Sequence, residues 1–96
     1  MNPEELIYTL VVTDIPLYNP PPQTEAFIKN LISVAKTEIA REGIQLNLND
    51  IDHAQTVAMY ASYLYRRRSA PQNGMPRMLR WRLNNLLFSQ KAKASE

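Results

Sequence analysis

The residues best suited to chemistry in this chain are arginines. Six of them lie in the second half, in two groups on either side of a short turn: Arg66, Arg67, Arg68, Arg77, Arg80 and Arg82. A planar guanidinium group binds both phosphates and carboxylates. Consecutive helical residues point about 100° apart, so the first three arginines cannot all face one phosphate cluster. We therefore expect these side chains to serve protein interfaces and internal ion pairs, with phosphate binding as the alternative.

Trp81 lies among these arginines, so a contact between its ring and a guanidinium group is also expected. Arg77 and Arg80 share one helical face at i, i+3 spacing, and the neighbouring indole ring is suited to stack on a guanidinium group. We take Trp81, together with the six arginines, as a candidate interface residue.

Catalysis and metal binding find little support in the sequence. The single histidine, His53, follows Asp52 at the start of a predicted helix, and we interpret it as an exposed or capping side chain. The chain has no cysteine, its serines lack a nucleophile elbow, and Gly43 and Gly74 do not make a phosphate-binding loop. We expect no enzyme activity, no cofactor and no bound metal.

Charge is distributed unevenly along the chain. Residues 1–50 hold three basic and seven acidic side chains, whereas residues 51–96 hold eight basic and two acidic ones. Opposed charged surfaces would suit self-assembly or contact with a polyanion. The alternative is that the two halves pair with each other and the field largely cancels.

Length and composition indicate one domain over residues 1–96. A chain of 96 residues that is 45% hydrophobic has enough apolar side chains for one small core. The acidic start does not resemble a signal peptide, and no apolar run approaches the ~20 residues of a membrane span. We expect a soluble intracellular protein with no membrane contact.

The elements that would position these residues are helices. Asn2 is a predicted N-cap, and the first helix should not exceed about ten residues, because β-branched residues follow from Val11 and Pro16 disfavours a helical residue before it. A proline-rich loop is predicted over 13–22. Its apolar residues Ile15, Leu17 and Tyr18 pack on the core, the interpretation we favour, or form an assembly arm that contacts a neighbour.

Three further helices are predicted after this loop. The second begins near residue 23 or 24 and ends at 42, where Gly43 supplies a stop. Residues 44–48 alternate apolar and polar side chains, but a lone strand has no partner here, so we predict an extended connector. The third helix, over 51–69, is capped by Asn49 or Asp50 and should be central. The fourth begins at 76 and gives way to a flexible tail over 91–96. The fold class is thus all-α, a small bundle of about four helices.

Residues 28–90 carry a resemblance to a known family. Three segments account for it: Ala-Arg-Glu-Gly-Ile at 40–44, Val-Ala-Met-Tyr-Ala-Ser-Tyr-Leu-Tyr-Arg-Arg-Arg at 57–68, and Met-Pro-Arg-Met-Leu-Arg-Trp-Arg-Leu-Asn-Asn-Leu-Leu-Phe-Ser-Gln at 75–90. This pattern resembles phage and prophage head-tail connector proteins, the small α-helical head-completion adaptors. The proline-rich stretch over 13–22 departs from this pattern, because such adaptors usually have a more polar, acid-rich segment before the second helix.

The resemblance implies a structural role in a virion. Such a subunit forms a homo-oligomeric ring below the portal, with a dodecamer as one expectation, and extends the DNA channel. Its partners would be the portal protein and the next head-tail joining protein, with non-specific contact to passing DNA. It would be found at the virion neck, and in the host cytoplasm during assembly. The alternative is a small helical DNA-binding or DNA-packaging accessory protein that uses the arginines, and a weaker one is a regulatory protein with a docking helix.

Overall fold

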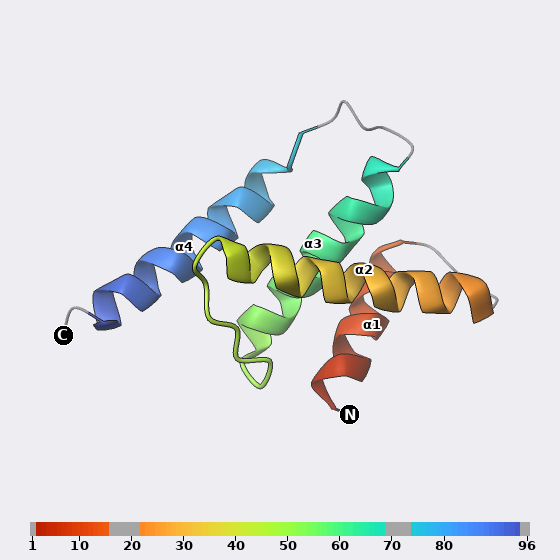
Figure 1. The fold of residues 1–96 in the computed structure, drawn as a ribbon, viewed down its shortest axis with the longest axis horizontal. Coiled ribbons are helices and arrows are strands. Elements are labelled where there is room, and N and C mark those ends of the chain that lie inside the picture. Colours follow the sequence, from red (N-terminus) through yellow and green to blue (C-terminus); the bar gives the residue numbers. More distant parts are fainter. Residues whose placement is uncertain (1, 16–21, 69–73, 95–96) are drawn as a thin grey trace.

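Four helices make up the part of the chain that the computed structural model describes, residues 2–15, 22–68 and 74–94 (Figure 1). They are α1 (Pro3–Asp14), α2 (Pro22–Arg41), α3 (Ile51–Arg67) and α4 (Arg77–Ala94). These residues contain no strand, and residues 44–47 form an extended connector between α2 and α3. The prediction of an all-α bundle of four helices is confirmed.

Helix α3 is the centre of the bundle, as predicted. It packs against α1, α2 and α4, and eight of its residues are buried. Figure 1 shows α2 crossing α3, with α1 beside them and α4 on the far side of α3. The molecule measures 48 × 35 × 18 Å, so the helices form a flat arrangement with no deep interior.

The core consists mainly of aliphatic side chains from the first three helices. Ile7 and Val11 of α1, Ile28 and Ile39 of α2 and Val57 of α3 are fully buried. Burial of one such side chain stabilises the fold by about 1.5–3 kcal/mol. Helix α4 adds two fully buried or nearly buried residues to this core, Leu79 and Leu83.

Helix α1 is longer than the sequence predicts. It extends to Asp14, so residues 13 and 14 are helical and not part of a loop. The hydroxyl of Thr13 donates to the carbonyl of Thr9 at 2.7 Å, and Val11 is fully buried against the core. Tertiary burial therefore outweighs the small cost of β-branched residues in a helix.

The predicted proline-rich loop is only partly within the described residues. Ile15 is 6% exposed and belongs to the core, so the favoured interpretation is confirmed for this residue and the alternative, an assembly arm, is wrong for it. The other two predicted arm residues, Leu17 and Tyr18, lie outside the described residues. Pro22 is the first residue of α2 and not the last of the loop, which fits the preference of proline for the first helical position.

Helix ends in the second half also differ from the prediction. Helix α3 ends at Arg67, and α4 begins at Arg77, with the amide of Arg80 donating to the carbonyl of Pro76 at 3.1 Å. Helix α4 continues to Ala94, so residues 91–94 are not a tail. Lysine and alanine favour helix, and cations at a helix C-terminus interact favourably with its dipole.

The predicted stop after α2 is confirmed, because Gly43 has a φ of 93°.

Candidate functional site

The six arginines do not converge on one site. Arg66 donates to the Asp14 side chain at 3.1 Å and to the Asp14 carbonyl at 3.2 Å, which ties the end of α3 to the end of α1. The guanidinium of Arg68 lies over the Phe27 ring, 4.5 Å from its centroid, and 5.6 Å from that of Tyr65. Both arginines therefore have structural roles inside the chain.

Two of the three arginines at the start of α4 also have partners within the chain. Arg80 forms two hydrogen bonds to the carboxylate of Glu42, at 2.6 and 3.3 Å. Arg82 lies 3.5 Å from the Gln55 amide oxygen, and its Nε is buried without a hydrogen-bond partner. Within residues 2–15, 22–68 and 74–94, the exposed side chains of Arg67 and Arg77 make no ion pair, hydrogen bond or ring contact. Only these two remain as candidates for an external ligand.

Arg80 and Glu42 form the strongest polar link between α4 and the rest of the fold. The hydrogen bond that Arg80 donates to Glu42 raises the pKa of Arg80 above its usual value, so this guanidinium group stays charged at neutral pH. Tyr60 of α3 lies close to this pair. Burial, and after it the negative charges of Glu38 and Glu42, raise the pKa of the Tyr60 hydroxyl.

Most acidic side chains of the first half are already paired within the molecule. Two ion pairs join the two halves of the sequence, Asp14 with Arg66 and Glu42 with Arg80. Three more lie within the first half: Glu4 with Lys36, Glu25 with Lys29, and Glu38 with Arg41. The two pairs between the halves offset only two of the four excess negative charges of residues 1–50, so the halves neutralise each other in part.

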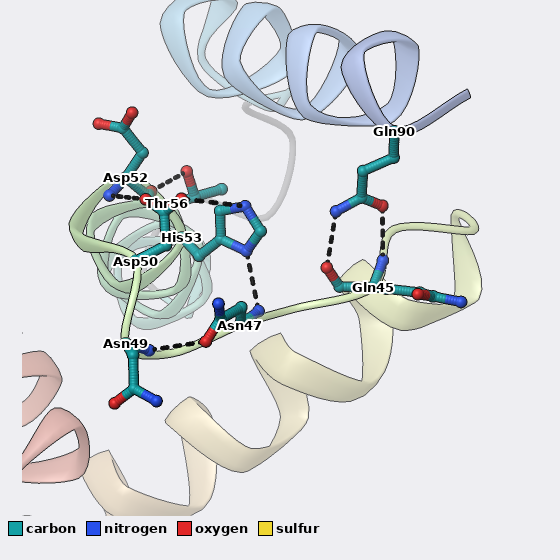
Figure 2. A network of polar contacts seen from close by, with 8 residues as sticks. All are labelled: Gln45, Asn47, Asn49, Asp50, Asp52, His53, Thr56 and Gln90. Atoms are coloured by element: carbon teal, nitrogen blue, oxygen red, sulfur yellow. Dashed lines mark hydrogen bonds and ion pairs between the residues drawn. The ribbon is translucent and has the colours of Figure 1, made fainter. Parts of the chain in front are cut away.

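The connector between α2 and α3 is held at two points by side chains (Figure 2). The Gln90 amide of α4 donates to the carbonyl of Gln45 at 2.7 Å, and its oxygen accepts from the Gln45 amide at 2.8 Å. The second point is His53, whose Nδ1 accepts from the amide of Asn47 at 2.9 Å. The connector is therefore fixed to α3 and α4 without a second strand.

His53 and Gln90 show where sequence reasoning fell short. His53 is only 9% exposed, so the prediction of an exposed side chain was wrong, and its structural role is to hold the connector. Gln90 was not singled out, although it lies on the same helical face as Leu79 and Leu83. The predicted cap of α3 is confirmed, because the Asp50 carboxylate accepts from the amide of Asp52 at 2.9 Å.

The outward face of α4 is the unusual surface of this molecule. Met78, Trp81 and Phe88 are 61%, 61% and 63% exposed, although all three are large and apolar. At about 100° per residue, Trp81 and Phe88 lie roughly 180–200° around the helix from the buried Leu79. We call Met78, Trp81 and Phe88 the α4 ridge. Arg77 lies on this side of the helix, and the described cations that contact rings lie over Tyr8, Phe27 and Tyr65, so the structure does not show the predicted stacking on Trp81.

Two open clefts lie beside α1. The first, of about 520 Å³, is formed with α3 and the start of α4, and its lining includes Leu10, Met59, Arg66 and Arg67. The second, of about 600 Å³, lies between α1 and α2. Its lining residues are Asn2, Glu4, Glu5, Tyr8, Thr9, Glu25, Lys29 and Ile32. The first cleft has a cationic rim, whereas carboxylates predominate in the second, which we call the α1–α2 groove.

Comparisons with known proteins yield no relative. No protein-family model, curated protein or solved structure matches the chain. Among the described residues, no group of three or more histidine or acidic side chains is placed to hold a metal ion. The described helices also include none with the length and apolar character needed to cross a bilayer. The resemblance to head-tail connectors therefore stays a prediction.

Proposed function

We propose that this chain is a structural subunit of a tailed-phage or prophage particle. In this role it assembles with copies of itself into a connector ring below the portal and extends the DNA channel toward the next head-tail joining protein. The proposal is supported by the resemblance carried by residues 28–90 and by the all-helical fold. It contains no catalytic step.

The α4 ridge is the observation that carries the proposal. Three of the five exposed large hydrophobic side chains of the described residues are on this one helix: Met78, Trp81 and Phe88. Aromatic residues and methionine are enriched in the buried centres of protein interfaces, and an exposed apolar patch marks a surface that another protein covers. A helix that is apolar on two opposite sides is suited to lie between its own core and a neighbouring subunit.

The arrangement of the arginines favours a structural role over tight DNA binding. A protein that binds DNA mainly through phosphates presents several cations to the backbone at once. Here Arg66 and Arg80 are in ion pairs and Arg68 lies on aromatic rings, which leaves Arg67 and Arg77. Two exposed cations suit the weak, sequence-independent contact that a channel wall needs with passing DNA.

Assembly with the portal protein encoded in the same genome tests the proposal. We expect the chain to form rings on the portal, seen by electron microscopy and measured as a large complex by light scattering. The double variant Trp81→Asp with Phe88→Asp should abolish the rings and keep the helix content measured by circular dichroism. Gln45→Asp with Asn49→Asp is the matched control, because it adds the same charge to exposed polar positions between α2 and α3, away from the α4 ridge. A chain that stays monomeric on the portal at all concentrations contradicts the proposal.

Duplex DNA binding separates the alternative. A phosphate-binding accessory protein should lose affinity by about 10³-fold or more between low and moderate salt. We expect the isolated chain to bind duplex DNA too weakly for such a titration. Tight, salt-sensitive binding that is lost in Arg67→Glu with Arg77→Glu and retained in Trp81→Asp would favour the DNA-binding role instead.

A further inference from the structure

The charges around the α4 ridge limit what it can contact. Helix α4 contains no aspartate or glutamate, and Arg77 lies on the same side of the helix as the ridge. A contact between two α4 helices would therefore offer Arg77 no carboxylate, and in a parallel contact the two Arg77 side chains would face each other. Like charges that face each other across an interface are unfavourable. The partner surface for the ridge should therefore be apolar in its centre and acidic at its rim.

The α1–α2 groove has both properties. The half-buried Tyr8 contributes apolar surface to its lining beside the buried Ile32, and the Lys29 ammonium group lies 5.6 Å from the centroid of the Tyr8 ring. The carboxylates in the lining are Glu4, Glu5 and Glu25. Two of these are neutralised by lysines of α2, while Glu5 accepts only a hydrogen bond from the Asn2 side chain among the described contacts, at 3.3 Å. Glu5 therefore remains available to an external cation.

The other cleft does not complement the ridge. Its rim carries Arg66 and Arg67, and its one carboxylate, Asp14, already pairs with Arg66. Arg77, which lies beside the ridge, and the arginines at this rim would repel each other. Of the two clefts, the α1–α2 groove is the one whose charge fits α4.

The ridge and the groove lie on different sides of helix α3. Figure 1 shows α4 on one side of α3, and α1 with the first half of α2 on the other. Leu79 and Leu83 turn the inner side of α4 toward the core, so the ridge faces away from the groove of its own chain. Two faces on different sides of α3 can only meet between copies, in a head-to-tail contact. Repetition of such a contact produces a closed ring or an open filament.

We infer that the α4 ridge of one copy docks into the α1–α2 groove of the next copy. The inference rests on the proposed function and adds which two faces meet in the ring. Trp81 is the central anchor, since an indole ring combines a large apolar surface with an N–H group that a groove carboxylate accepts. At the rim, Arg77 of one copy pairs with Glu5 of its neighbour. In the assembled ring, Arg67 is then the exposed arginine that remains for contact with passing DNA.

Exchange of the two rim charges tests this contact. Glu5→Lys and Arg77→Glu should each weaken self-association by about tenfold or more, because each places like charges in contact. An equimolar mixture of the two variants should assemble as the unchanged chain does, since every contact in an alternating ring then joins opposite charges. Trp81 is the only tryptophan of the chain, so a shift of its emission to shorter wavelength reports docking directly.

Matched variants control for charge and for folding. Asp52→Lys also replaces an exposed acid in the first turn of a helix, and Arg67→Glu also reverses an exposed arginine, but both lie away from the ridge and the groove. We expect neither to change assembly. Glu5→Gln removes the charge but keeps a hydrogen-bond acceptor for Asn2, so the start of α1 is preserved. This variant should still weaken assembly, and by less than Glu5→Lys.

The possible outcomes separate this inference from the proposed function. Stronger association of Arg77→Glu alone would show that two α4 helices pair with each other, and would overturn the docking inference. Failure of the mixture to recover, in a chain that still forms rings on the portal through Trp81, would overturn the inference and leave the connector role intact. A chain that forms no ring under any condition would contradict both.

Discussion

Helices α1, α2 and α3 are held together by fully buried aliphatic side chains, whereas α4 is attached by two buried leucines, two partly buried ones and several polar contacts. The polar contacts reach α4 from three places: Glu42 at the end of α2, Gln55 on α3 and Gln45 in the connector. Hydrogen bonds and partly exposed ion pairs stabilise a fold less than the burial of large side chains does. The two regions should therefore differ in stability, with α4 as the weaker one.

This difference has a consequence for assembly. A helix that depends on a few contacts with its own core gains more from a partner than a helix that is already surrounded. The α4 ridge lies on this weaker helix and not on the three-helix core. The region with the fewest internal contacts thus presents the surface that we propose for the neighbouring copy.

Removal of a buried side chain from the three-helix core and from α4 should give the largest losses in the free energy of unfolding. The two losses should also differ from each other. Ile39→Ala removes a fully buried side chain from α2, and we expect a loss of about 2–5 kcal/mol in the free energy of unfolding. Leu83→Ala, at an equally buried site of α4, should cost less, because α4 can separate from the core locally. Urea unfolding followed by circular dichroism gives the free energies. Hydrogen exchange should show loss of protection in α4 alone for Leu83→Ala, and equal global losses would contradict the comparison.

Loss of His53 on α3 should cost more unfolding free energy than loss of Gln90 on α4, although the difference is smaller than for the two core substitutions. His53→Ala leaves the Asn47 amide without its partner beside a buried site, and we expect a cost of about 1–3 kcal/mol. Gln90→Ala removes two more exposed hydrogen bonds to Gln45, with an expected cost of about 1 kcal/mol. Amide exchange at residues 45 and 47 locates each effect. A larger loss for Gln90→Ala would mean that α4 contributes more to the fold than its burial indicates.

The smallest expected effect concerns Tyr60, which lies where the two regions meet. Burial raises the pKa of the Tyr60 hydroxyl in the folded state, so the folded state resists ionisation more than the unfolded chain does. The resulting stability is fully present below the ordinary tyrosine pKa of about 10 and is lost as the pH rises through the folded value. Tyr60→Phe should reduce this alkaline loss, measured as the urea midpoint on either side of about pH 10. An unchanged pH dependence would mean that Tyr60 ionises as easily in the folded state as in the unfolded one.

The helices were largely predictable from the sequence, because breakers and apolar spacing are local signals. Gly43 ends α2, Asp50 caps α3, and the spacing of Leu79 and Leu83 places the inner side of α4. The end of α1 was missed, since burial of Val11 against other helices decided it. Such burial depends on residues far away in the sequence.

The candidate site was predictable in residue type but not in arrangement. The arginines and Trp81 stood out by composition, yet their partners come from distant positions, as in the pairs Arg66 with Asp14 and Arg80 with Glu42. The α1–α2 groove joins residues of two helices and has no signature in either of them. His53 was interpreted as an exposed or capping side chain because it follows Asp52 at the start of a helix, but it is buried and holds the connector.

The sequence by itself determined the all-helical class, the stop after α2 and the absence of cysteine chemistry, since these follow from residue type and from spacing within one or two turns. The tertiary structure alone decided which charges are neutralised and which residues of α1 and α2 meet in the groove. Ion pairing and burial act over a few ångströms in space, and only folding brings residues from different helices to that distance. The groove between α1 and α2 is a product of that step.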